Sequence, residues 1–256
     1  MMEFNLTGFL TLLRKEVMRF WKVGVQTVFS PMVTTLLYLL IFSYVLEDRV
    51  NVFPGVSYTE FLVPGLMMMS IIQNAFANSS SSLIQSKVTG NLVFILLPPL
   101  SSLEFYLAFV LAAAIRGMLV GVSVYIVAIF FVDLSLDHLG AILLFAFLAS
   151  SVMGAFGVIA GIWAEKFDQI AAFTNFFVVP LSFLSGVFYS INDLPAFWRG
   201  VSHLNPFFYM IDGFRAGFIG HSDVSLAFSF AFVLGFLMLL SAAALWMLGT
   251  GYKMRG

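Results

Sequence analysis

The sequence predicts an all-α integral membrane protein with six transmembrane helices. Six stretches of 24 to 29 residues contain no Asp, Glu, Lys or Arg, apart from Arg116 in the third stretch. A bilayer core of about 30 Å requires roughly 20 apolar helical residues, and charged side chains are costly in hydrocarbon. The chain is also 61% hydrophobic and 10% charged, whereas a soluble domain is about 25% charged.

The length of 256 residues fits one membrane domain, 1–256. We place its spans at about 23–46, 59–83, 103–131, 139–163, 169–189 and 224–248. Ser57 with Glu60 and Ser101 with Glu104 have the spacing of capping boxes, which indicates that helices start there. Between the second and third spans, the link 85–102 is long enough for a short helix near the membrane surface. The other inner link, 164–168, is tight and charged.

The basic residues predict the orientation of the chain. With six spans, both termini lie on one side, and eight basic residues fall there: Arg14, Lys15, Arg19, Lys22, Lys87, Lys166, Lys253 and Arg255. Three fall on the other side: Arg49, Arg199 and Arg215. Short cytoplasmic loops are the ones enriched in Lys and Arg, so we expect both termini to be cytoplasmic.

Residues 1–22 predict an amphipathic helix that lies in the membrane interface. One arc of the helical wheel carries Leu6, Phe9, Leu10, Leu13, Val17, Phe20 and Trp21. The other arc carries Thr11, Arg14, Lys15, Arg19 and Lys22. A basic amphipathic helix of this kind favours the interfacial plane. It serves as a membrane anchor, and it could also present a surface to a cytoplasmic partner.

The link between the fifth and sixth spans, 190–220, predicts a re-entrant helical segment on the outer side. Asn192 or Asp193 precedes Pro195, and Asn205 precedes Pro206, so each pair reads as a helix N-cap followed by proline. The segment also carries the aromatic residues Phe197, Trp198, Phe207, Phe208 and Tyr209. Two short helices dipping into the outer leaflet fit this pattern, and a passive outer cap is the alternative.

Polar residues inside the spans are candidate functional residues. Asn74 and Asn78 recur at helical spacing in the second span, where they either join helices or line a pathway. Arg116 lies eleven residues beyond Phe105, or about 16 Å deep at 1.5 Å per residue. An arginine at that depth should face protein or water. It pairs with carbonyl groups or an unidentified acid, or it contacts a substrate.

No catalytic, cofactor-binding or metal-binding motif is apparent on the chain. It has no cysteine, and its three histidines, His138, His203 and His221, do not form an HExxH or similar metal spacing. None of the five lysines follows glycine, so the sequence contains no phosphate-binding P-loop. If ATP powers transport, another chain must hydrolyse it. The rival interpretations are a self-sufficient channel or ion-coupled secondary transporter, which normally needs intramembrane acids, and a membrane scaffold or assembly factor.

Two segments carry a resemblance to the permease subunit of bacterial ABC-2 type transporters. One is YTEFLVPGLM at 58–67, which leads into the polar run 74–82. The other starts with FLSGVFY at 183–189 and continues through Leu194-Pro195, Phe197-Trp198, HLNP at 203–206 and the stretch 209–215. The resemblance covers essentially the whole chain, and the order and spacing of these pieces are more specific than any one of them.

The resemblance implies an exporter in the bacterial inner membrane that works with a separate ATPase subunit. Members commonly combine two permeases with two ATPases, which would hold the ATP and Mg, and no nucleic acid is involved. A physical argument also favours pairing of two copies. A tightly packed six-helix bundle leaves no route for a large solute, whereas a seam between two copies provides one. Family members that share this outline export amphiphilic drugs, lipids and glycans, so the resemblance does not fix the substrate.

The resemblance also implies roles for particular residues. The pathway would be lined by the second and fifth spans, with Asn74, Asn78, Phe183 and Tyr189, and Arg116 is a further candidate. The N-terminal helix, 7–22, would lie at the cytoplasmic interface, and the links 85–102 and 164–168 would contact the ATPase. The candidate coupling residues are Arg14, Lys15, Lys87, Asn91, Glu165, Lys166 and Asp168. The candidate outer gate residues are Pro195, Phe197, Trp198, Asn205, Pro206 and Tyr209.

Overall fold

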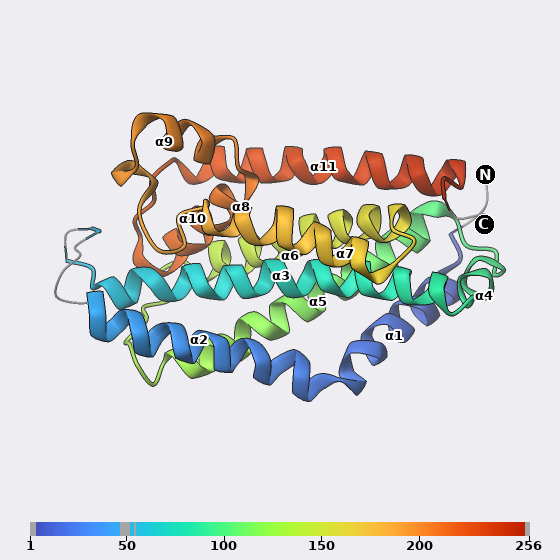
Figure 1. The fold of residues 1–256 in the computed structure, drawn as a ribbon, viewed down its shortest axis with the longest axis horizontal. Coiled ribbons are helices and arrows are strands. Elements are labelled where there is room, and N and C mark those ends of the chain that lie inside the picture. The colour runs from blue at the N-terminus through green and yellow to red at the C-terminus, as the bar shows by residue number, and fades with distance from the viewer. Residues whose placement is uncertain (1–3, 47–51, 54, 254–256) are drawn as a thin grey trace.

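The computed structural model describes residues 4–46, 52–53 and 55–253, and the regular structure within these ranges is helical (Figure 1). Five described helices are long and apolar enough to cross a membrane: α2 (Gly24–Leu46), α3 (Tyr58–Val88), α5 (Ser102–Ala128), α6 (Leu139–Trp163) and α11 (Leu226–Thr250). Arg49 and Arg255, which the orientation argument uses, lie outside the described residues.

Shorter helices connect or flank these five. They are α1 (Leu6–Lys22), α4 (Leu92–Leu96), α7 (Phe167–Phe173), the π-helical turn η1 (Thr174–Val178), α8 (Val179–Phe183), the 3₁₀ turn η2 (Ile191–Asp193), α9 (Ala196–His203) and α10 (Pro206–Ile219). The structure therefore contains the short helix predicted in the link 85–102, as α4. Both predicted capping boxes are confirmed, because Ser57 and Ser101 each accept from the backbone N–H of the glutamate three residues later.

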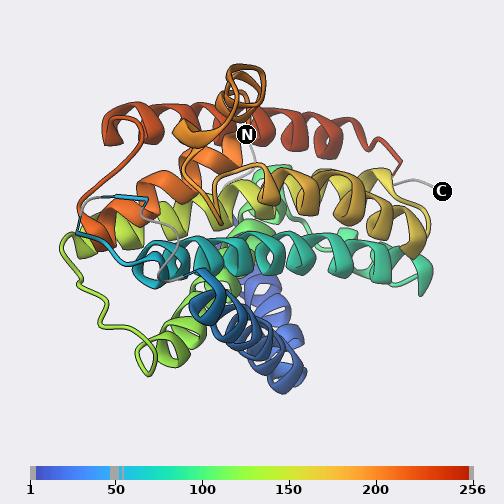
Figure 2. The ribbon, with the colours of Figure 1, turned by 60° about the vertical axis from the view of Figure 1, so that its left-hand side comes forward.

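The long helices run side by side along the longest axis of the molecule (Figure 1). α3, α5 and α6 pack against one another at the centre, and α10 fills the space between α3, α6 and α11. The two termini and α4 lie at one end of this bundle, whereas α9 and α10 lie toward the other end (Figure 1). α1 and α2 project from the bundle on the side of α5 (Figure 2).

Small residues on α6 allow this helix to approach α3 closely. A Cβ atom added at Gly157 would lie 2.6 Å from the carbonyl oxygen of Phe76, and one at Gly161 would lie 2.7 Å from Cβ of Leu83. Such contacts supply van der Waals packing, which is what joins helices where the surrounding solvent is lipid. By contrast, the outward faces of α2 and α11 are apolar and exposed, as lipid-facing surfaces require.

The region predicted as the fifth span, 169–189, differs from a continuous helix. α7, η1 and α8 form one apolar helical segment, Phe167–Phe183, that contains a π-helical turn and ends six residues before Tyr189. Pro180 lies just beyond the π-helical turn, where the lack of a backbone N–H removes one bond of the regular α-helical ladder. After Phe183 the chain turns at Gly186, whose φ of +75° is disfavoured for residues with a side chain.

The link 190–220 contains the two expected short helices, but one predicted cap is wrong. Asn205 caps α10, with Pro206 in its first turn. Asn192 and Asp193 do not cap α9, because they form η2, and α9 begins only after Pro195. The side-chain amide of Asn192 donates to Asp223 Oδ1 at 2.8 Å, so it is held away from the helix.

Candidate functional site

Arg116, the charged residue within the third uncharged stretch, is hydrogen-bonded to Asn74. Its Nη2 donates to Asn74 Oδ1 at 3.0 Å, which joins α5 to α3. The side chain is half-buried, and its Nε lies buried without a hydrogen-bond partner among the described residues. The partner of Arg116 is thus the side-chain amide of Asn74, and no carboxylate of the described residues forms a salt bridge with it.

Asn78, one helical turn further along α3, is buried by the N-terminal helix. Arg19 of α1 donates from Nη2 to the Asn78 carbonyl oxygen at 2.5 Å and to Asn78 Oδ1 at 3.1 Å. Arg19 Nη1 donates to Ser81 Oγ at 3.2 Å. Arg19 therefore turns inward toward α3, although the helical wheel had assigned it to the polar outer arc.

Glu16 completes this set of contacts, which we call the α1–α3 network (Glu16, Arg19, Asn78, Ser81 and Ser82). The Glu16 side chain is fully buried and accepts from Arg19 Nε at 3.3 Å, Ser82 Oγ at 2.9 Å and Lys15 Nζ at 2.8 Å. Burial of a carboxylate is costly unless it is paired and hydrogen-bonded. Glu16 is not among the residues predicted from the sequence, although an acid among basic residues, three positions before Arg19, was a signal for such a pair.

The candidate coupling residues lie at the end of the bundle that holds the termini. Lys87 donates to the carbonyl oxygens of Ile162 and Ala164 (3.0 Å for Ala164), so it caps the C-terminus of α6. Glu165 pairs with Lys253 at 2.9 Å, and this hydrogen bond and charge hold the pKa of Glu165 below its ordinary value. The remaining candidates, Arg14, Lys15, Asn91, Lys166 and Asp168, are exposed.

The short helix α4 presents an apolar surface at the same end. Leu92 is buried against the bundle, whereas Val93, Phe94 and Leu97 are exposed. Cavities of about 400 Å³ lie on both sides of α4, one toward α1 and one toward the end of α11, and both are lined in part by Ile95 and Leu100. This region is therefore a protruding apolar ridge with hollows beside it.

At the opposite end, Arg215 of α10 ties three segments together. Its Nε donates to the carbonyl oxygen of Phe61 at 3.2 Å, and its Nη2 donates to that of Gly186 at 2.6 Å. The guanidinium also lies 3.7 Å from the centre of the Phe61 ring. Arg215 was expected from the sequence only as an outer basic residue, whereas it is among the largest fully buried side chains described.

The candidate outer gate residues divide into two groups. Asn205 Nδ2 donates to the Leu181 carbonyl oxygen at 2.7 Å, and Tyr209 Oη donates to that of His203 at 2.8 Å, so both hold the segment in place. Pro206 forms the first turn of α10. Pro195, Phe197 and Trp198 are exposed, and the Phe197 and Trp198 rings meet edge-on at 5.3 Å.

Phe183 and Tyr189 lie beside an aromatic group at the junction of α8 and α2. Tyr189 Oη donates to the Phe183 carbonyl oxygen at 3.0 Å. The Phe183 ring stacks on Phe188 at 5.5 Å, and Phe188 contacts Tyr38 and Phe42 of α2. Phe183 is exposed, so its ring is accessible to a molecule that contacts α8.

The comparisons with known proteins identify the family. Residues 7–219 match the family model described as ABC-2 type transporter. The chain belongs to the ABC-2 type transporter family. The inner membrane transport permease YadH of Escherichia coli K12 is 38% identical over 224 residues, which cover 88% of this chain and 88% of YadH. YadH of Escherichia coli O157:H7 and of Shigella flexneri match with the same figures. As an ABC-2 family member, the chain is a component of a transport system rather than a catalyst, and its apolar helices agree with a multi-pass membrane protein.

Proposed function

We propose that this chain is the permease subunit of an ATP-binding-cassette exporter in a bacterial inner membrane. The match of residues 7–219 to the ABC-2 family model carries the proposal. The relatives named inner membrane transport permease support the location and the role. A separate ATPase subunit, which holds ATP and Mg, supplies the energy, because the chain has no Gly-Lys pair for a P-loop.

The proposed topology has six crossings, with both termini in the cytoplasm. The fifth crossing is the α7–η1–α8 segment, whose 17 residues reach about 25 Å at 1.5 Å per residue. This length is slightly below the roughly 30 Å hydrocarbon core, so the turn after Phe183 would lie within the outer leaflet. The re-entrant α9 and α10 would then close the outer side. The excess of basic residues at the end with the termini supports this orientation.

Transport proceeds by alternating access at a seam between two copies of the chain. The route is lined by α3 and α8 residues, with the Asn74–Arg116 pair at mid-span and Phe183 and Tyr189 nearer the outer side. Because Arg116 forms no salt bridge with a carboxylate in the described part of the chain, it is suited to an anionic or hydrogen-bond-accepting part of an amphiphilic, lipid-like, drug-like or glycan substrate. Asn78 contributes indirectly, since it holds α1 against α3.

Two ATPase subunits press on the inner end of the bundle. The exposed apolar residues of α4 and the exposed charges of 164–168 form the contact, together with Arg14, Lys15 and Asn91. Lys87 acts within the chain, because it joins the end of α3 to the end of α6. Motion of the contact would therefore reach both central helices together.

Co-purification of the tagged chain tests the proposal, with an ATPase of roughly equal stoichiometry expected in the complex. Vesicles containing the chain and its ATPase should export solute only with ATP. Vesicles with the chain alone that concentrate a solute would contradict the proposal and favour a self-sufficient secondary transporter.

The coupling contact has its own test. A double substitution, Glu165→Ala with Lys166→Ala, should lower substrate-stimulated ATPase activity of the complex. Lys253→Met serves as the control, since it removes the partner of Glu165 within the chain and leaves both link side chains in place. Unchanged activity in the double variant would place the contact elsewhere.

A further inference from the structure

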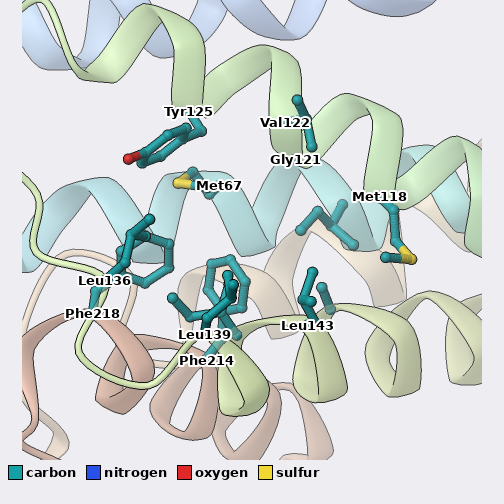
Figure 3. Close-up of a pocket in the computed structure, with 13 residues that line it drawn as sticks. Met67, Met118, Gly121, Val122, Tyr125, Leu136, Leu139, Leu143, Phe214 and Phe218 are labelled. Atoms are coloured by element: carbon teal, nitrogen blue, oxygen red, sulfur yellow. The ribbon is translucent and has the colours of Figure 1, made fainter.

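An apolar cavity of about 150 Å³ lies between α3, α5, α6 and α10, and the residues assigned to the proposed pathway do not line it (Figure 3). Its floor consists of Met67 and Ile71 from α3 and Phe214 and Phe218 from α10. The rest of the wall comes from the last three turns of α5, the loop that follows it and the first two turns of α6. It therefore lies in the half of the bundle opposite the termini.

The mouth of this cavity opens between α5 and α6. Val122, Leu139 and Leu143 line it and are 60%, 53% and 48% exposed, whereas Phe214 at the bottom is 1% exposed. Apart from the phenol of Tyr125, the lining side chains are hydrocarbon or thioether. Both α5 and α6 are apolar helices long enough to cross a membrane. The mouth is thus continuous with a surface that faces lipid.

We infer that this cavity holds part of an acyl chain from a phospholipid of the surrounding bilayer. Water is a poor occupant, because a buried water needs about 2–4 polar partners, while dry apolar cavities of about 150 Å³ take up small hydrocarbons. An empty cavity would leave its lining atoms without dispersion contacts on one side. The bilayer supplies hydrocarbon at the mouth of the cavity, and no other apolar molecule is present there at comparable concentration.

The acyl chain is held by packing rather than by the hydrophobic effect, since the lipid it leaves is equally apolar. Its end would contact Phe214 and Phe218 of α10, the helix that also carries Arg215. A bound lipid would therefore pack against α10 on a face next to the one that carries Arg215. This inference does not depend on the proposed transport function, and its test requires neither ATP nor an ATPase.

Photo-crosslinking in vesicles tests the inference. The chain is reconstituted into phosphatidylethanolamine and phosphatidylglycerol vesicles that contain phosphatidylcholine with a diazirine near the end of one acyl chain. Labelled peptides are mapped by mass spectrometry. We expect label on Phe214 or Met67, which surface lipid does not reach, in addition to label on the outward faces of α2 and α11.

Two neighbouring tryptophan variants distinguish the cavity from general lipid contact. Leu143→Trp fills the mouth, whereas Leu144→Trp changes a residue of similar exposure (42%) that does not line the cavity. Label on Phe214 should fall at least about fivefold in Leu143→Trp, the equivalent of about 1 kcal/mol, and should persist in Leu144→Trp.

Absence of label on Phe214 and Met67 in the wild type, or equal label on them in the two variants, would overturn the inference. Gel filtration and the melting temperature establish that each variant is folded. If Leu143→Trp does not fold, Val122→Trp repeats the comparison, with Ile126→Trp as its control on the same helix, because Ile126 is 48% exposed and does not line the cavity.

Discussion

Arg19→Ala should detach the N-terminal helix from the bundle. Arg19 makes four hydrogen bonds, to Glu16, Ser81 and two acceptors of Asn78, at 2.5 to 3.3 Å. The variant removes all of them and leaves the buried carboxylate of Glu16 with Lys15 and Ser82. The expected result is a loss of docking free energy between α1 and α3, with the rest of the bundle intact.

The size of the loss in docking free energy follows from the burial of the Arg19–Glu16 ion pair. Breaking a buried ion pair by removing one partner costs about 3–5 kcal/mol. The lower end applies here, because the Arg19 side chain is 23% exposed and Lys15 still neutralises Glu16. Since each 1.4 kcal/mol is a factor of ten, a loss of about 3 kcal/mol should raise the undocked population of α1 about a hundredfold.

Cysteine labelling measures this population directly, since the chain has no cysteine of its own. Leu12 lies on the buried face of α1 and is 6% exposed, so a Leu12→Cys probe reacts with a water-soluble maleimide only when α1 undocks. The labelling rate of Leu12→Cys is compared with that of the same protein carrying Arg19→Ala. Arg14→Ala is the matched control, because Arg14 has the same charge on the same helix and is exposed.

The reasoning is refuted if Arg19→Ala labels within about twofold of Arg14→Ala, the range of an ordinary surface substitution. Apolar packing of Leu12 and Phe20 would then hold α1, and the α1–α3 network would add nothing measurable.

Three further substitutions should lower the melting temperature, by about 2–4 °C for each kcal/mol lost. Asn74→Leu removes the acceptor for Arg116 and should cost about 1–3 kcal/mol, because it leaves a buried donor unpaired. Gly65→Ala would place a Cβ atom 2.8 Å from the Val187 carbonyl oxygen and should cost about 1–3 kcal/mol through overpacking. Lys87→Met removes the cation at the C-terminus of α6 and should cost about 1 kcal/mol.

Each of these has a control and a contradicting result. Asn74→Asp keeps an acceptor, so it should melt at or above the wild-type temperature, and equal losses in both Asn74 variants would contradict the pairing. Gly235→Ala meets nothing within 4 Å inside α11 and should not lower the melting temperature, since Ala is the better helix former, so an equal loss there would point to backbone effects. Lys166→Met changes an exposed lysine, and a loss matching that of Lys87→Met would exclude a specific cap.

Much of the fold could be predicted because the bilayer imposes strong constraints on sequence. Long uncharged stretches correspond to α2, α3, α5, α6 and α11, and two capping boxes fixed the starts of α3 and α5. Local sequence signals gave a wrong prediction where a contact with a distant residue competed with them. Asn192 and Pro195 have the spacing of a helix start, yet the side chain of Asn192 binds Asp223, which lies 31 residues away in sequence.

The candidate sites could be predicted by residue type but not by role. An arginine in a span is conspicuous, so Arg116 was found, yet its partner lies 42 residues away. The helical wheel assigned Arg19 to the polar arc, because a wheel describes one helix alone and carries no information about the neighbouring helix α3. Arg215 appeared to be an ordinary outer cation, although it binds a carbonyl group 154 residues away.

The sequence by itself determined that this protein is helical, lies in a membrane and belongs with ABC-2 permeases, since these properties depend on composition, periodicity and short motifs. Only the tertiary structure decided which polar groups pair, which glycines allow two helices to approach closely and where the apolar cavity opens. The reason is physical: hydrocarbon cannot solvate a charged or polar group, so each one must find a partner within reach, and reach is set by how the helices pack.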